Sequence, residues 1–160
     1  MADPLDRPLV IGNCSGFYGD RLSAMREMVE GGPLDVLTGD YLAELTMLIL
    51  GRDQLKDPAL GYARTFARQL EECLGLALER GVRIVSNAGG LNPSGLAARV
   101  VEIAAAQGLA PSVAYVDGDD VRARLDALGD APRAEVGVRG QRLGEVGAQV
   151  VAGHDADLRA

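Results

Sequence analysis

The chain has 160 residues, of which 48% are hydrophobic and 24% are charged, and its formal net charge is −7. This length and composition are those of one globular domain, and they exclude a chain that is disordered throughout. The basic residues are dispersed among acidic ones, which excludes the clustered charge of a nucleic-acid-binding protein. The longest apolar stretch, residues 45–50, is too short to span a bilayer, and the N-terminus lacks a secretion signal. We therefore expect a cytoplasmic protein whose partners are neither nucleic acid nor a membrane.

Short β-type runs alternate with longer helical patterns from residue 8 to about residue 128. The predicted strands are residues 9–11, 34–37, 82–85 and 113–116. The predicted helices are residues 22–29, 41–50, 62–77, 93–104 and 121–128, with Asp20, Asp40 and Asn92 as N-caps and Pro93 at a first helical position. This alternation is typical of βαβ units. We predict the α/β class, with a mainly parallel sheet of about four strands, flanking helices and an incomplete three-layer, Rossmann-like arrangement.

Residues 131–160 have a different pattern, because they lack aromatic residues and isoleucine and carry Gly, Ala and Arg at short intervals. Isolated glycines weaken strands and helices alike, so we expect no more than one weak strand near Val136 and Val138. The composition predicts an irregular tail. The single histidine, His154, lies in this tail and is interpreted as a surface residue.

Polar residues and glycines follow each predicted strand. In an open parallel sheet, ligands bind beyond the carboxyl ends of the strands, where loops and helix N-termini converge. The predicted ligand-binding residues are Gly12, Asn13, Ser15 and Gly16 after the first strand, Thr38, Asp40 and Tyr41 after the second, and Asn87, Gly89, Gly90 and Asn92 after the third. The alternative is structural, because Asp40 and Asn92 also suit helix caps and Gly89-Gly90 suits a turn.

Three residues are candidates for catalysis, namely Cys14, Asp20 and Asp40. Cys14 lies in a turn of small residues before a helix N-terminus, which favours a thiolate. The alternative is a buried, inert thiol, since the predicted core offers no histidine to activate it. Asp20 and Asp40 are interpreted as an acid or base, or as helix caps.

No cofactor and no metal are predicted. Cys14 and Cys73 lie in different settings, so they indicate neither a metal site nor a disulfide. Gly12, Gly16 and Gly19 do not have the spacing of a dinucleotide-binding loop or a P-loop. Ser15 lies outside a G-x-S-x-G elbow, so a serine hydrolase is not indicated either.

Two segments, "IGNCSGFYGDRLSAMREMVEGGPLDVLTGDYLAELTMLIL" and "GYARTFARQLEECLGLALERGVRIVSNAGGLNP", resemble the N-terminal part of the acyclic terpene utilisation (AtuA-type) family. The resemblance spans residues 8–128. It implies a cytoplasmic bacterial protein that acts in the catabolism of terpenoids such as citronellol and geraniol, or of other acyl-CoA intermediates. The matching motif residues are Gly12, Asn13, Ser15, Gly16, Asp20, Thr38, Gly39, Asp40, Tyr41, Glu44, Asn87, Gly89, Gly90, Asn92 and Pro93.

Members of this family run to several hundred residues, so the resemblance implies that the chain is an N-terminal fragment with a truncated or frame-shifted tail. The first functional hypothesis is an enzyme fragment that binds a small-molecule substrate, a CoA thioester or a related carboxylate, at the strand ends. CoA would then be part of the substrate and not a cofactor. The alternatives are a non-catalytic binding or assembly module beside the carboxylase or hydratase of the pathway, and an inactive truncated product. A homo-oligomer or a complex with a pathway enzyme is the expected assembly.

Overall fold

The computed structural model describes residues 7–118, 120 and 148–153. In chain order the elements are β1 (Ile11–Asn13), α1 (Ala24–Gly31), β2 (Val36–Gly39), α2 (Glu44–Lys56), α3 (Arg64–Glu79), β3 (Arg83–Gly90), α4 (Pro93–Ala106), β4 (Ser112–Tyr115) and β5 (Ala148–Gly153). Each predicted strand and helix up to residue 116 has its counterpart among them. The helix predicted at residues 121–128 lies outside the described residues.

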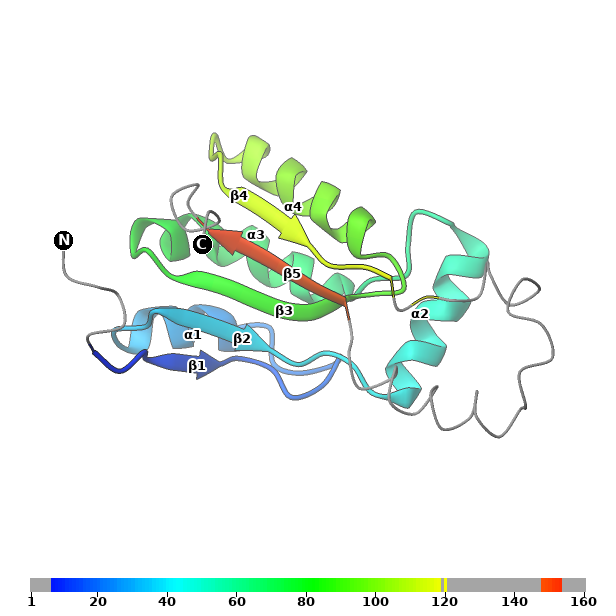
Figure 1. Cartoon of the computed structure of the whole chain (residues 1–160), viewed down its shortest axis with the longest axis horizontal. Helices are drawn as coiled ribbons and strands as arrows, with labels where there is room; N and C mark the ends of the chain where they lie inside the picture. Colours follow the sequence, from blue (N-terminus) through cyan, green and yellow to red (C-terminus); the bar gives the residue numbers. More distant parts are fainter. Residues whose placement is uncertain (1–6, 119, 121–147, 154–160) are drawn as a thin grey trace.

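One five-stranded sheet forms the centre of the molecule, with the order β1-β2-β3-β5-β4 (Figure 1). The pairs β1–β2 and β2–β3 are parallel, whereas β5 is antiparallel both to β3 and to β4. Strands β1 to β4 therefore all run in the same direction, and β5 is antiparallel to them. The α/β class and the mainly parallel sheet are confirmed.

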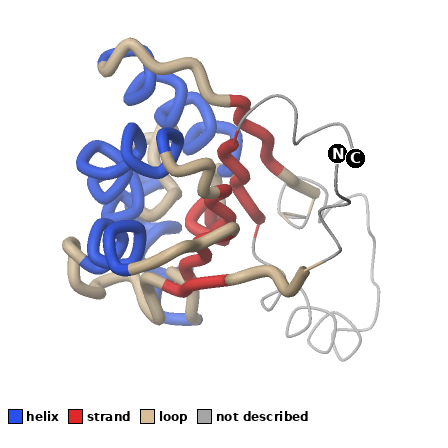
Figure 2. The backbone as a smooth tube through the Cα atoms, turned by 90° about the vertical axis from the view of Figure 1, so that its left-hand side faces the viewer, coloured by secondary structure: helices blue, strands red, loops and turns tan. Residues whose placement is uncertain are grey.

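Helices α1, α3 and α4 cover one face of this sheet, as Figure 2 shows with the helices in blue and the strands in red. The order of the strands explains this, because each crossover from β1 to β4 advances toward the same edge of the sheet. Right-handed crossovers that all advance in one direction place every helix on the same face. Of the three layers of a Rossmann-like arrangement, the described residues thus supply two. We call the other side of the sheet the open face.

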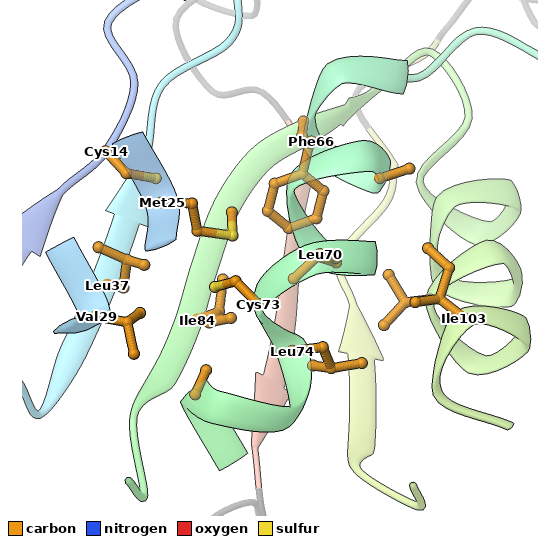
Figure 3. Close-up of a cluster of buried hydrophobic side chains, with 14 of the residues drawn as sticks. Cys14, Met25, Val29, Leu37, Phe66, Leu70, Cys73, Leu74, Ile84 and Ile103 are labelled. Atoms are coloured by element: carbon orange, nitrogen blue, oxygen red, sulfur yellow. The ribbon is translucent and has the colours of Figure 1, made fainter. Parts of the chain in front are cut away.

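The core lies between the sheet and α1, α3 and α4 (Figure 3). Helix α3 contributes an apolar stripe at helical spacing, in which Phe66, Leu70 and Leu74 are almost completely buried. Leu37 of β2 and Ile84 of β3 meet this stripe from the sheet. Since side chains alternate along a strand, the neighbours of Leu37 and Ile84 lie on the open face.

The ends of two helices agree with local sequence signals. Asn92 caps α4, because its Oδ1 accepts a hydrogen bond of 2.9 Å from the N–H of Gly95, and Pro93 takes the first helical position as predicted. Gly81 follows α3 with a φ of +68°, a left-handed conformation that glycine adopts readily. The N–H of Val82 then bonds Ala77 O at 2.9 Å, which turns the chain into β3.

Two predicted caps are wrong. Helix α1 begins after Ser23 and not after Asp20, and α2 begins after Ala43 and not after Asp40. In both places the aspartate side chain bonds backbone N–H groups of its own loop, so the loop extends for a few more residues before the helix begins.

Strand β5 lies within the tail that was predicted to be irregular. Residues 148–153 pair along their length with β3 on one side and β4 on the other. The weak strand expected near Val136 and Val138 falls outside the described residues, as does His154. The sheet therefore takes the antiparallel strand between β3 and β4 from a segment whose composition did not predict one.

Candidate functional site

The loops that follow β1, β2 and β3 are joined to one another by hydrogen bonds. The N–H of Cys14 bonds Thr38 O at 2.9 Å, and the N–H of Asp40 bonds Ser15 O at 3.0 Å. The hydroxyl of Ser86 donates to Gly39 O at 3.0 Å. These bonds fix the three loops at the carboxyl ends of the parallel strands, which is where such sheets bind their ligands.

A hollow of about 200 Å³ opens at this edge of the sheet. We call it the strand-end hollow, and its lining consists of Asn13, Thr38, Gly39, Asp40, Val85, Ser86 and Asn87. Asn13 and Thr38 are partners in the β1–β2 register, and Thr38 and Val85 are partners in the β2–β3 register. Residues paired in this way point to the same side of a sheet, so these three side chains lie on the open face.

A pair formed by Asp40 and Asn87 lies at the centre of the hydrogen bonding in the hollow. Asp40 Oδ1 accepts bonds from Asn87 Nδ2 at 2.6 Å and from the N–H of Leu42 at 3.1 Å. Asn87 Oδ1 accepts a bond of 2.8 Å from the N–H of Tyr41. Within the described structure, Asp40 Oδ2 makes no hydrogen bond, which leaves one carboxylate oxygen exposed at the hollow.

Asn87 lies in an irregular part of β3. Ser86 pairs with Val150 and Gly90 pairs with Ala148, so β3 has more residues than β5 between these two pairs. Extra residues of this kind bend a strand and redirect its side chains, and they occur often beside functional sites. At this bulge, Asn87 reaches Asp40, the first residue after the neighbouring strand β2.

Asn13 and Thr38 form the other side of the hollow. Asn13 Nδ2 donates to Ser15 O at 2.9 Å, and Thr38 Oγ1 lies 3.1 Å from Gly12 O and 3.2 Å from Asn13 Oδ1. A primary amide carries two N–H hydrogens, and one bond each is accounted for on Asn13 Nδ2 and Asn87 Nδ2. The hollow thus combines two amide groups that can still donate with one carboxylate that can accept.

Asp20 lies apart from Asp40, in a second hollow that Asn13, Cys14, Ser15, Gly16 and Asp20 help to line. Its carboxylate accepts bonds from the N–H of Gly16 at 3.0 Å and of Arg21 at 2.8 Å. These two backbone bonds lower the pKa of Asp20, so the group stays ionised at neutral pH. Its geometry is that of a brace that closes the loop after β1.

Cys14 and Ser15 are buried beneath that loop. The Cys14 thiol lies 3.9 Å from the hydroxyl of Tyr41, and burial raises the pKa of Cys14. A nucleophilic cysteine requires the opposite, an accessible thiol with a lowered pKa. Ser15 is also buried, and its hydroxyl donates to Phe17 O at 3.0 Å.

Tyr41 points into the core and not into the hollow. Its hydroxyl donates to Oε1 of buried Gln69, and its ring packs edge to face on Phe66 with 5.5 Å between the ring centroids. Burial raises the pKa of the Tyr41 hydroxyl far above its ordinary value. A side chain on Gly39 would collide with the Tyr41 ring, so the glycine makes room for this packing.

The remaining predicted residues make structural contacts. A side chain on Gly12 would displace the flexible end of Met28, and one on Gly90 would lie 2.8 Å from the backbone oxygen of Gly61. Asn92, besides capping α4, donates to Ala59 O at 3.0 Å and to Leu60 O at 3.1 Å. Gly89, Gly90 and Asn92 do not line the strand-end hollow.

Comparison with known protein families places the chain in a family. The model of the family described as "Acyclic terpene utilisation family protein AtuA" matches residues 9–155. The chain belongs to this family. The match extends past residue 128, where the resemblance was expected to end, and it includes all five strands of the AtuA-family sheet. No curated protein and no solved structure matches the chain.

Membership of the AtuA family connects the chain with acyclic terpene utilisation. In the part of the chain that the structure describes, no helix is long and apolar enough to cross a membrane. The same residues contain no group of three or more His, Cys, Asp or Glu side chains that could hold a metal ion. The lining of the hollow itself presents amide groups, hydroxyl groups and one carboxylate.

Val85 is the apolar residue of the lining, and it is not among the ligand-binding residues predicted from the sequence. Those residues are polar groups and glycines, whereas Val85 contributes an apolar wall. Its place could have been found from the period of two along the strand, because Ile84 is buried and Val85 must therefore face the other side.

Proposed function

We propose that the strand-end hollow binds the carbonyl end of a small-molecule intermediate of acyclic terpene utilisation, a CoA thioester or a related carboxylate. The observation that carries the proposal is the Asp40–Asn87 pair with Asn13 opposite, which gathers polar groups from three loops beside the apolar wall of Val85. Such a combination of few polar groups and an apolar wall is typical of small-molecule sites.

The amides of Asn13 and Asn87 would donate to the carbonyl oxygen of the ligand. Each amide nitrogen already makes one hydrogen bond to a fixed protein group, so the direction of its other N–H is set before a ligand arrives. Groups oriented in advance lose little freedom on binding, which favours affinity. Asp40 Oδ2 would accept a proton or a hydrogen bond from a hydroxyl or an acidic C–H next to that carbonyl.

Charge favours the thioester over the free carboxylate. Asp40 is ionisable, and the residues that line the hollow include no Lys or Arg to balance a second negative charge. The volume of about 200 Å³ is below the usual range for a drug-sized ligand, so the hollow suits an acyl group whose CoA moiety lies outside.

A non-catalytic binding module is the second candidate. Two observations favour it. The polar side chains of the hollow bond the neighbouring loops, and the described residues include no histidine that could shuttle a proton. In that function the chain would hold the intermediate, or dock, beside the carboxylase or hydratase of the pathway. The free, buried thiols of Cys14 and Cys73 support a reducing, cytoplasmic location for either candidate.

The experiment measures the binding of a branched acyl-CoA thioester, the corresponding free acid and CoA alone, by calorimetry and thermal shift. We expect the thioester to bind best. Asn87→Ala should lower the affinity for the thioester by roughly 3- to 10-fold, because one hydrogen bond to the ligand is lost. Asp40→Asn should strengthen binding of the free acid, because it removes the repulsion of like charges. Asp117→Asn, an exposed aspartate after β4 that lies outside the hollow, is the matched control.

Two further readouts separate the candidates. Asp40→Asn should abolish thioester turnover while binding persists if the chain is an enzyme. Loss of association with the pathway's carboxylase or hydratase, with no turnover in the unmodified chain, would favour the binding module. Absence of binding for all three ligands would refute the proposed site.

A further inference from the structure

Helix α2 differs from the other helices in its packing. Helices α1, α3 and α4 pack on the sheet or on one another, whereas α2 has no comparably extensive partner among the described elements. Figure 1 shows α2 standing at the carboxyl ends of the strands, beyond the layer formed by the other helices. Only Thr46 and Leu50 of α2 are buried.

The side of α2 that faces away from Thr46 and Leu50 is apolar. Leu45, Leu48 and Leu55 are 68%, 60% and 87% exposed, and Ile49 is 36% exposed. We call this side the outer stripe of α2, and it consists of Leu45, Leu48, Ile49, Arg52, Leu55 and Lys56. At about 100° per residue these six positions fall within roughly one third of the circumference of the helix. A contiguous exposed stripe of large aliphatic side chains is a mark of an interaction surface.

The arrangement of the stripe indicates what covers it. Leu45 and Leu55 lie at equal distances from Leu50 along the helix, and so do Leu48 and Arg52, and Glu44 and Lys56. Consider a second α2 that runs antiparallel across the outer stripe and is related by a two-fold axis at the level of Leu50 along the helix. Leu45 of each copy then meets Leu55 of the other, and Glu44 of each copy lies beside Lys56 of the other. A parallel second helix would place Glu44 on Glu44 and Lys56 on Lys56.

The charges at the two ends of α2 support the antiparallel arrangement. Glu44, Arg52 and Lys56 are exposed and have no ion-pair partner in the described part of the chain. An antiparallel pair brings each Glu44 to the end of the other helix that carries Lys56. It also places the positive N-terminal end of each helix dipole beside the negative C-terminal end of the other. The stem of Arg52 would cover Leu48 of the other copy while its guanidinium remains in water.

We propose that α2 is a homodimer interface, in which the outer stripe packs antiparallel on the same stripe of a second copy of this chain. The surface is self-complementary, as an isologous contact across a two-fold axis requires. A single pair of helices buries less than a standard protein interface, so the dimer forms at high concentration and dissociates on dilution. The helix lies four residues after Asp40, which places the interface beside the strand-end hollow without using any of its lining residues.

The first test is sedimentation equilibrium of the full chain over a wide range of concentration. We expect a monomer–dimer equilibrium that Leu48→Arg weakens by at least about tenfold, because the introduced guanidinium then lies against Arg52 of the other copy and the apolar contact of Leu48 is lost. Val101→Arg is the matched control, since Val101 is an apolar residue of α4 with 53% exposure. A chain that is monomeric at every concentration, or a dimer that Leu48→Arg leaves unchanged, would overturn the proposal.

The second test determines the orientation. Leu48→Cys and Arg52→Cys are prepared as separate variants, and each is oxidised alone and in an equal mixture. An antiparallel pair predicts cross-linking mainly in the mixture, because residue 48 then faces residue 52 of the other copy. Cross-linking of each variant to itself, with no gain in the mixture, would contradict this orientation. Cys14 and Cys73 are buried in the unmodified chain and should give no background.

Discussion

The two faces of the sheet have different compositions and serve different purposes. On the covered face, Leu37 and Ile84 are almost fully buried against α1 and α3, whereas on the open face Ile11 keeps 60% of its surface exposed. Asn13 and Thr38, two polar residues of the strand-end hollow, also belong to the open face. In this chain the covered face maintains the fold, so side chains of the open face such as Asn13 and Thr38 are available for the proposed ligand.

The largest expected change in stability comes from a substitution on the covered face, and it tests whether that face maintains the fold. Phe66→Ala, on the covered face, should lower the free energy of unfolding by about 3–5 kcal/mol, because it removes a buried ring and leaves a cavity. Ile11→Ser, on the open face, should change it by only about 0.5 kcal/mol. Urea unfolding followed by circular dichroism measures both. Equal losses for the two variants would show that the open face is also covered in solution.

A smaller loss in the free energy of unfolding is expected when a hydroxyl group is removed from the core or from the open face. Tyr41→Phe should cost about 1–3 kcal/mol, because it leaves Oε1 of buried Gln69 without its donor. Thr38→Val removes a hydroxyl that is only partly buried, and it should cost less. The double variant Tyr41→Phe/Gln69→Leu should recover part of the loss, since it removes both buried polar groups. If Thr38→Val proves the more harmful of the two single variants, the hydroxyl of the open face has a structural role.

The smallest effect is a dependence on alkaline pH that arises on the covered face. Burial raises the pKa of Cys73 from 9.0 to about 11. The unfolded chain therefore loses this proton first, so the stabilisation is complete below pH 9 and declines as the pH rises toward 11. The slope is at most about 1.4 kcal/mol per pH unit for one thiol. Cys14 and Tyr41, whose pKa values are also raised, add changes of the same sign.

Thermal unfolding from about pH 8 to about pH 10 measures this slope. Cys73→Ala should be less stable at every pH but should show a flatter pH profile. Asp57→Asn, an exposed residue beyond the end of α2, should have the slope of the unmodified chain. A Cys73→Ala profile parallel to that of the unmodified chain would mean that Cys73 is accessible to solvent in the folded state.

The parts of the fold that could be predicted from sequence are those that depend on neighbours along the chain. The Asn92-Pro93 start of α4 and the Gly81 end of α3 are local signals, and both hold. The aspartates at positions 20 and 40 carry the same type of local signal, but their side chains bond loop N–H groups that no helical pattern reveals. Strand β5 depends on two partners far away in sequence, so its short apolar run gave no adequate signal.

The candidate site was predictable to the same degree. The topology of a parallel sheet is enough to bring Asn13, Thr38, Asp40 and Asn87 to one edge, and they line one hollow. The direction of Tyr41 was not predictable, because a phenol suits a ligand pocket and a buried hydrogen bond equally well. Its partner Gln69 lies on α3 and reads in the sequence as an ordinary surface residue of a helix.

The position of β5 has a consequence for how the sheet assembles. Strand β4 is joined to the rest of the sheet through β5, and β5 begins only at Ala148, long after β3 ends at Gly90. Closing such a distant pairing is slow, since the chain loses the entropy of a large loop before any strand contact forms. During synthesis, β3 and β4 therefore expose unpaired backbone N–H and C=O groups until β5 has been made. These exposed edges can pair with strands of other chains. The final zippering of residues 148–153 between them is the event that turns two separate edges into one continuous sheet.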